Sequence, residues 1–208
     1  MVTKAIEKKA EIIFRELNEI PFFAQFYLAG GTALAVQIGH RISFDLDFFS
    51  QNFFSVKNTR NGLRSLGAVN VRLEDEHSLG VIVRGVKMSF LEYPYPLLFP
   101  AIKWKNHGNL CDIRDIGCMK LDAIASRGTK RDFVDLYFIT RKYSLKKLLD
   151  LFKKKYKGIE YNYLHLLKSI CYFEDAEADP TPKMLVDLSW EKIRANFIKE
   201  IDTLSKKV

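Results

Sequence analysis

Hydrophobic residues follow two different periods along the chain, and the period changes near its middle. In the first half they alternate with polar residues or form short runs, as in Val69–Glu74, Leu79–Arg84 and Val86–Glu92. Side chains on a strand point to alternate faces, so this pattern predicts β-strands, and the last two segments predict a hairpin that turns near Gly85. In the second half apolar residues recur at every third or fourth position, which predicts helices.

Helices are expected around the strands and throughout the second half. Thr3–Asn18 has apolar residues at helical spacing and predicts an amphipathic helix packed on the sheet, and Ser55 can cap a helix that stops at Gly67. Further helix caps are expected at Asp112, Thr129, Ser144 and Ser189. Prolines at alternate positions in Tyr93–Pro96 exclude a central strand, so Pro94–Gly108 is expected to be a linker.

These elements predict an α/β (α+β) fold with two domains. Residues 1–96 are expected to form a mixed β-sheet with flanking helices, and residues 97–208 a C-terminal helical bundle. The chain has 208 residues, of which 48% are hydrophobic and 13% aromatic, so it can bury a core and is not expected to be disordered.

The segment Phe26–Ser50 is expected to fold as strand, glycine turn, short helix and second strand. Its first apolar run ends at Gly30-Gly31, and Thr32 can cap a helix of two turns that ends at Gly39. A glycine turn that opens a helix presents backbone N–H groups and the positive end of the helix dipole. Both features suit a phosphate group.

Two aspartates stand in the second strand of that segment, Phe44–Phe49. Asp45 and Asp47 are two residues apart, so both point to one face while Leu46 points to the other. No lysine separates these carboxylates, and Mg²⁺ is a cation that takes carboxylate and phosphate oxygens. Turn and aspartates together predict a site for a nucleoside triphosphate with its metal ion. The simpler alternative is an ordinary turn beside two solvated aspartates.

The order and spacing of these residues resemble a known signature. Gly30–Thr32, followed by twelve residues and then Asp45–Asp47, looks like the motif of the polymerase-beta-type nucleotidyltransferases. The longer string GGTALAVQIGHRISFDLDFFS is similar to the AbiEii/AbiGii-type toxin family of that superfamily, and Asp115–Ile139 resembles the later motifs of that family.

The resemblance implies a nucleotidyltransferase-like mixed sheet followed by a helical domain. It also implies transfer of a nucleoside monophosphate from an NTP to an RNA acceptor, with Mg²⁺ as cofactor and tRNA as the expected acceptor. As in the family, the chain would be the toxin of a toxin–antitoxin or phage-defence system, and a cognate antitoxin protein would be encoded nearby.

Two later helices are expected to bring charged residues together. Lys120 and Arg127 share one face of the first helix, and Asp132 and Asp135 share one face of the second. One interpretation is a salt-bridge network between neighbouring helices. The other, which the resemblance favours, is that Lys120 meets phosphate oxygens while an aspartate orients it or joins the metal. The later aspartate of the family falls on Asp132 or Asp135, and Asp132 is the first choice by position.

The expected site is therefore as follows. The catalytic residues are Asp45, Asp47, Lys120 and Asp132. The nucleotide-binding residues are Gly30, Gly31, Thr32, Arg41, Lys120, Arg127 and Asp135. The metal ligands are Asp45 and Asp47.

One expected group is missing from the sequence. The superfamily usually has a third carboxylate on a later strand, where this chain has Ser89. That carboxylate normally helps to deprotonate the attacking hydroxyl and completes a second metal site. Glu92 is near, but by parity it lies on the opposite face. Glu92, a later carboxylate or a water could replace the group, or the chemistry differs.

The net charge of +8 is concentrated in one stretch. Arg141–Gly158 contains eight basic residues and one acid, Asp150. A polyanionic partner such as RNA is one explanation, and a solvated basic helix face is the other. The sequence has no apolar run of eighteen residues and no signal peptide, so no membrane span and a cytoplasmic location are expected. Three cysteines without CxxC spacing are expected to be reduced and buried: Cys111, Cys118 and Cys171.

Three other functions fit parts of the pattern. A nucleotidyltransferase for small molecules such as aminoglycosides would take polycations, which a protein of charge +8 repels. A non-catalytic nucleotide-sensing or partner-binding module of the same fold is supported by Ser89. A haloacid-dehalogenase-type phosphatase also has an Asp-x-Asp motif, but Phe48 stands where that class has a small hydroxyl residue.

Overall fold

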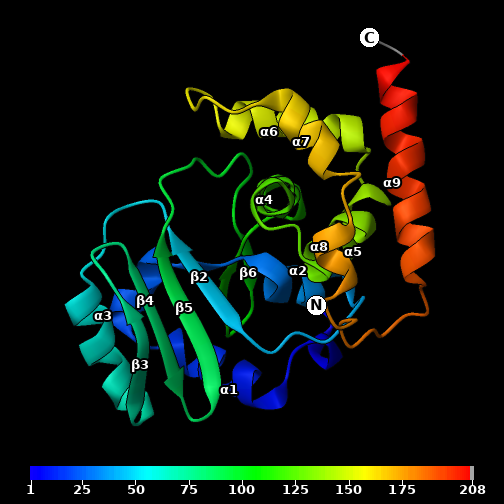
Figure 1. Cartoon of the computed structure of the whole chain (residues 1–208). Coiled ribbons are helices and arrows are strands. Elements are labelled where there is room, and N and C mark those ends of the chain that lie inside the picture. Colours follow the sequence, from blue (N-terminus) through cyan, green and yellow to red (C-terminus); the bar gives the residue numbers. More distant parts are fainter. Residues whose placement is uncertain (207–208) are drawn as a thin grey trace. The chain divides into compact units, whose positions relative to one another are not determined.

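The structure is a computed structural model that describes residues 1–206. The chain divides into two compact units, the first comprising Met1–Asp112 and the second beginning at Ile113. Figure 1 shows the elements of both units. The boundary expected at residues 96/97 lies earlier in the chain than the one between these units, because the intervening segment contributes strands to the first unit.

The first unit is built on a mixed sheet, as the sequence predicts. Its seven described strands lie in the order β3-β4-β5-β2-β1-β7-β6, with β2–β5 and β1–β7 parallel and the other pairs antiparallel. The strands are β1 Tyr27–Leu28, β2 Leu46–Ser50, β3 Val69–Glu74, β4 Ser78–Val83, β5 Val86–Glu92, β6 Ile102–Trp104 and β7 Gly108–Leu110.

The predicted hairpin is formed by β4 and β5. Arg84 and Gly85 connect them with φ values of 49° and 79°. Positive φ at both central residues gives the turn the twist that two-residue hairpins need, so the prediction of a turn near Gly85 is confirmed.

The segment expected to be a linker is partly structured. Pro94 and Pro96 lie outside the strands, but β6 and β7 pair with each other after them. β7 then pairs in parallel with β1, where Leu110 lies opposite Leu28. The sheet therefore extends to the end of the first unit.

One face of the sheet is buried against helices. The described α-helices of this unit are α1 Lys8–Leu17, α2 Gly30–Ile38 and α3 Val56–Leu63. Figure 1 shows α1 and α3 on the same side of the sheet. Phe14 of α1 packs on Phe48 at 5.4 Å between ring centroids, and Phe48 packs on Phe90 at 5.2 Å. The helix expected over Thr3–Asn18 is interrupted, because Ile6 forms a bridge with Ser43 before α1 begins.

The second unit is helical in the part that the structure describes, as the sequence predicts. Its helices are α4 Ile113–Ser126, α5 Lys130–Thr140, α6 Leu145–Lys155, α7 Tyr163–Ser169, α8 Glu174–Glu177 and α9 Trp190–Ser205. The hydroxyls of Ser144 and Ser189 accept backbone N–H groups and cap α6 and α9, as expected. Within residues 1–206, no helix combines the length and apolarity that a membrane crossing requires.

Candidate active site

The predicted glycine turn lies at the start of α2 and against β2. Gly30 has φ of +61°, a value that side-chain-bearing residues rarely adopt, and a Cβ atom added to it would lie 3.3 Å from Oδ2 of Asp47. The backbone N–H of Ala29 donates to the carbonyl of Asp47 at 2.9 Å. Glycine therefore allows the start of α2 to approach the aspartate strand closely.

Thr32 does not cap this helix, contrary to the prediction. α2 begins at Gly30 with Ala29 as its N-cap, and Thr32 lies within the first turn. The Thr32 side chain is buried, and its hydroxyl bonds with the Ser43 hydroxyl at 2.7 Å and with the carbonyl of Asp45. The residue thus holds the backbone next to Asp45, and the N–H groups of the first turn are left for other acceptors.

The two aspartates of the motif lie at the entry to β2. The strand begins at Leu46, so Asp45 comes just before it and not inside it as expected. Asp45 and Asp47 are both half-buried, whereas Leu46 and Phe48 between and beyond them are fully buried. The alternation places both aspartates on the side of the sheet opposite the aromatic core.

The position of the missing third carboxylate is directly beside Asp47. Ser89 of β5 pairs with Asp47 in the parallel register. Glu92 pairs with Ser50 instead, and its carboxylate lies 2.8 Å from Nδ1 of His77. Among residues 1–206 there is no cluster of three His, Cys, Asp or Glu side chains able to hold a metal ion. Two carboxylates fit one Mg²⁺ whose other ligands are phosphate oxygens and water.

The charged residues of the second unit come together as the spacing indicates. Nζ of Lys120 lies 2.9 Å from Oδ1 of Asp132 and 2.7 Å from Oδ2 of Asp135. Nε of Arg127 donates to the other oxygen of Asp132 at 3.1 Å, and the Thr129 hydroxyl donates to the same oxygen at 2.7 Å. We call these five residues the lysine cluster.

Charges within the lysine cluster are balanced and largely buried. The Lys120, Asp132 and Asp135 side chains are at most 8% exposed, whereas Arg127 is 65% exposed. Burial acts to raise the pKa of Asp132, but the positive charges of Lys120 and Arg127 outweigh it and lower that pKa from 3.8 to about 2. Asp132 is therefore ionised at neutral pH and holds the Lys120 ammonium group in place.

Arg41, expected to contact the triphosphate, lies inside the first unit. Its side chain is only 4% exposed, and one guanidinium nitrogen donates to the carbonyl of Ile42 at 3.3 Å. Arg41 is close to the aspartates in sequence, but its side chain is not exposed as a contact with the triphosphate would require.

Comparisons with known proteins agree with this geometry. The sequence profile of the family described as "Nucleotidyl transferase AbiEii toxin, Type IV TA system" matches residues 11–78, which contain the glycine turn and both aspartates. An uncharacterized protein of Aquifex aeolicus (strain VF5), aq_aa25, is 39% identical over 203 residues, with 95% of this chain and 97% of that protein covered. The chain belongs to the AbiEii family. The family predicted from the motifs is thereby confirmed.

A solved structure has a fold similar to that of this chain. MenT4, a nucleotidyltransferase toxin from Mycobacterium tuberculosis H37Rv, matches with a TM-score of 0.60 and 15% identity, over 94% of this chain and 82% of that chain. A likeness at this level of identity concerns the fold, and it confirms the predicted nucleotidyltransferase-like architecture. As a member of the AbiEii family, the chain is a nucleotidyltransferase of the toxin class.

Sequence reasoning missed a second buried ion pair in this AbiEii chain. Nζ of Lys155 lies 2.8 Å from Oδ1 of Asp115, and neither side chain is exposed. Lys155 belongs to the basic stretch in sequence, but it follows Leu148, Leu151 and Phe152 at helical spacing. Its place on the apolar stripe of α6 is the signal that could have revealed its burial.

Cys118 lies close to this pair, and its thiol is expected to be unreactive. Burial, with a further contribution from the Asp115 charge, raises the pKa of the Cys118 thiol to about 12. The thiolate is therefore rare at neutral pH, which agrees with the prediction of a buried, reduced cysteine.

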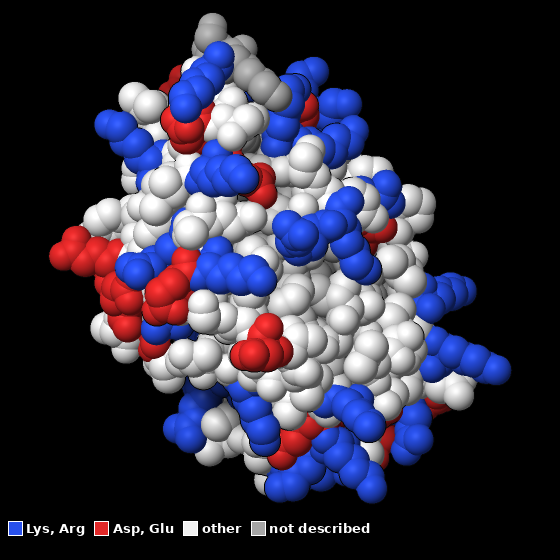
Figure 2. Space-filling model, turned by 90° about the vertical axis from the view of Figure 1, so that its right-hand side faces the viewer, with Lys and Arg blue, Asp and Glu red and all other residues white. Residues whose placement is uncertain are grey.

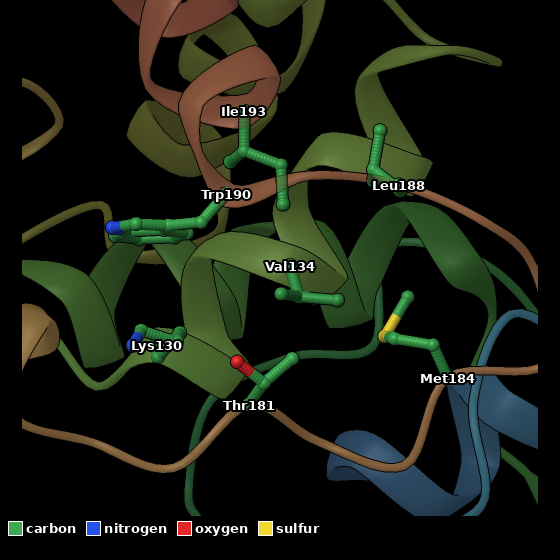
Figure 3. A pocket seen from close by; sticks show the side chains of 7 residues that line it. All are labelled: Lys130, Val134, Thr181, Met184, Leu188, Trp190 and Ile193. Carbon is green, nitrogen blue, oxygen red and sulfur yellow. The ribbon is translucent and has the colours of Figure 1, made fainter.

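A cavity in the second unit does not resemble a substrate site. It is lined by Lys130, Val134, Thr181, Met184, Leu188, Trp190 and Ile193 (Figure 3). Its volume is about 10 Å³, enough for one water molecule at most. Nζ of Lys130 donates to the carbonyls of Glu177 and Asp179 at 3.2 and 2.7 Å, so this lysine connects α5 to the end of α8 and the residues that follow it.

The basic stretch is mostly exposed. On the face seen in Figure 2, Lys and Arg side chains are spread over the surface with Asp and Glu among them. Along the chain the charges are less evenly mixed. Arg141–Gly158 has seven exposed cations and one acidic residue, Asp150, which pairs with Lys146 at 3.3 Å. This stretch is therefore the strongest positive segment of the second unit.

Proposed function

We propose that this chain moves a nucleoside monophosphate from an NTP to an RNA acceptor, expected to be tRNA, with Mg²⁺ bound by Asp45 and Asp47. The observation that carries the proposal is the 3.3 Å approach between the Cβ position of Gly30 and the Asp47 carboxylate. That approach puts a phosphate-binding helix start beside a carboxylate pair on one side of a sheet.

Residues at the start of α2 have the first role in this reaction. Backbone N–H groups of Gly30, Gly31 and Thr32 would hold triphosphate oxygens, because they point out of the helix and carry the positive end of its dipole. When bound by the two aspartates, Mg²⁺ would neutralise charge on the triphosphate.

The lysine cluster has the second role. In the proposed step the oxygen of an acceptor hydroxyl bonds to the α-phosphorus, the bond to the pyrophosphate oxygen breaks, and the hydroxyl proton passes to water. Lys120 would stabilise negative charge on the leaving pyrophosphate, with Asp132 and Asp135 fixing its ammonium group. Arg127, which is 65% exposed, would be the second phosphate contact.

The acceptor follows from charge. RNA is a polyanion, and the seven exposed cations of Arg141–Gly158 give it a complementary surface. The role as a toxin in the cytoplasm, in a toxin–antitoxin or phage-defence system, is proposed from family membership. A cognate antitoxin is then expected from the neighbouring reading frame.

One observation favours a second candidate function. Ser89 occupies the place beside Asp47 where a carboxylate would activate the attacking hydroxyl. Without that group, the fold could bind a nucleotide and not transfer it, which would make the protein a nucleotide-sensing module.

The experiment incubates the purified protein with each α-labelled NTP, Mg²⁺ and total RNA. We expect label to enter RNA, and we expect Asp45→Ala or removal of Mg²⁺ by EDTA to abolish this. Asp187→Ala, a change at an exposed aspartate, is the matched control and should transfer label normally. Triphosphate binding without transfer would favour the sensing module, and neither binding nor transfer would overturn both proposals.

A further inference from the structure

A row of aromatic rings lies beside the two aspartates of the candidate active site. Phe49 follows Asp47 by two residues on β2, and both are half-buried while Phe48 between them is fully buried. Residues two apart on a strand share a face and are separated by roughly 7 Å. Phe49 is therefore the next side chain after Asp47 on this face of β2.

Phe49 is the centre of this row. Its ring stacks on Tyr27 of β1 at 6.1 Å with an interplanar angle of 25°. It also meets Tyr93 edge-on at 5.4 Å, and Tyr93 meets Tyr95 at 4.7 Å. The register explains the row, because Tyr27 pairs with Phe49 in β1–β2 and the N–H of Tyr93 donates to the carbonyl of Ser50 at 2.7 Å.

The rings are not enclosed as core rings are. Phe48 and Phe90, on the other face of the same two strands, are completely buried. Phe49, Tyr93 and Tyr95 are only half-buried, so part of each residue is accessible to solvent. A contiguous set of partly exposed rings rimmed by polar residues is a feature of ligand-binding and interaction surfaces.

The neighbouring strand carries the same gradient. On β5 the residues that share the face of Asp47 are exposed Lys87, half-buried Ser89 and half-buried Leu91. Ser89 lies beside Asp47 and Leu91 beside Phe49. Along β2 and β5 this face changes from charged and polar to apolar and aromatic.

A nucleotide has the same order of chemistry, from charged phosphates through a polar sugar to a flat base. We propose that Phe49, supported by Tyr93, is a stacking platform for a nucleobase whose phosphate lies at Gly30 and Asp47. The platform rests on the proposed function for the position of the phosphate. The base belongs either to the NTP or to the reactive end of the RNA, and the stacking chemistry is the same for both.

Tryptophan at position 49 gives a test that needs no catalysis. Fluorescence of Phe49→Trp, corrected for Trp104 and Trp190 with the unmodified chain, is measured with each NTP, with tripolyphosphate and with a single-stranded oligoribonucleotide of mixed sequence. We expect quenching by the NTP or by the oligoribonucleotide, whichever supplies the base, and none by tripolyphosphate, which has no base. Phe53→Trp, at a 62% exposed ring on the following loop, is the matched control.

Kinetic variants give the second readout. Phe49→Leu keeps an apolar side chain but removes the ring, and it should raise KM for NTP or for RNA by about 10- to 100-fold, as expected for one stacked base. Phe49→Tyr restores the ring and should restore most of the binding, while Phe53→Leu should leave both KM values unchanged. A raised KM for NTP assigns the base to the triphosphate, and a raised KM for RNA assigns it to the acceptor.

Two outcomes separate this platform from the proposed transfer. If the unmodified chain transfers label but Phe49→Leu has normal KM values and Phe49→Trp is not quenched, the platform is overturned and the transferase stands. If no label is transferred but Phe49→Trp is quenched by an NTP and not by tripolyphosphate, the platform stands without the transferase.

Discussion

Two pairs of carboxylates in this molecule have opposite surroundings. In the second unit Asp132 and Asp135 are almost completely buried on either side of Lys120. In the first unit Asp45 and Asp47 are half-buried beside the start of α2. The same residue type is thus enclosed with a cation in one region and presented to solvent in the other.

The difference separates stability from ligand binding. A buried charge that keeps its partner is tolerated, but removing the partner leaves an uncompensated charge in a poor solvent. Two half-exposed carboxylates repel each other moderately and gain from a cation that arrives with a substrate. We therefore expect changes in the lysine cluster to affect folding first, and changes at Asp45 and Asp47 to affect activity first.

The largest effect is expected from Asp47→Asn, and it is on the transfer of label to RNA. The amide keeps the shape but loses the charge, so label transfer should fall by about 1,000-fold, as when an electrostatic group of a transition state is removed. The melting temperature should change little, because Asn keeps the shape of this half-buried side chain. A large fall in melting temperature would instead mean that Asp47 has a structural role.

The second largest effect is expected from Lys120→Met, and it is on the stability of the fold. It leaves two buried carboxylates without their shared ammonium group, and we expect a loss of about 3–5 kcal/mol in the free energy of unfolding. Lys146→Met is the matched control, because that lysine is 69% exposed and its pair with Asp150 should contribute less than about 1 kcal/mol. Denaturation by urea, followed by circular dichroism, measures both. Equal midpoints for the two variants would contradict the comparison.

Acid should weaken the lysine cluster in a defined window. The pKa of Asp132 is lowered from 3.8 to about 2, so between these values the unfolded chain binds more protons than the folded one. The contribution of this carboxylate, about 2 kcal/mol, is complete above about pH 4 and is lost as the pH falls toward 2. Unfolding of the natural chain and of Asp132→Asn should therefore be compared across this range, and their difference should narrow as the pH falls. A constant difference would show that Asp132 is not held ionised by Lys120.

The smallest effect distinguishes two glycines of positive φ. Gly30→Ala and Gly85→Ala should each cost about 1–2 kcal/mol for the left-handed backbone. Only Gly30→Ala also brings a methyl group against Asp47, since nothing lies within 4 Å of the Cβ position at Gly85. Nucleotide binding by titration should weaken for the first and not for the second. Equal binding by both would show that the close approach has no part in the site.

The sequence predicted well where local pattern and fold agree. β3 and the β4–β5 hairpin lie where alternation and the Gly85 turn placed them. Alternation does not reveal the strands β6 and β7, because three residues are too few to show it. They are strands because β7 pairs with β1 and β6 pairs with β7. Thr32 is not a cap because its hydroxyl bonds instead with Ser43 and Asp45, 11 and 13 residues further along the chain.

The sequence predicts which residues of the candidate site come together, but not which of their side chains are exposed. Helical spacing was enough to bring Lys120 to Asp132 and Asp135. Spacing does not tell whether a charge is solvated, so Arg41 and Lys155 were expected at the surface and are buried. Burial depends on the neighbouring elements, which local pattern does not contain.

The parallel pairing of β7 with β1 has a practical consequence for anyone who wishes to isolate the first unit. A fragment ending at Pro96 would strip the hydrogen-bonding partners from one side of β1, the strand that leads into Gly30. An uncovered strand edge invites pairing with another chain and aggregation. A fragment that continues to Asp112 keeps this edge paired, so it should aggregate less than the fragment that ends at Pro96.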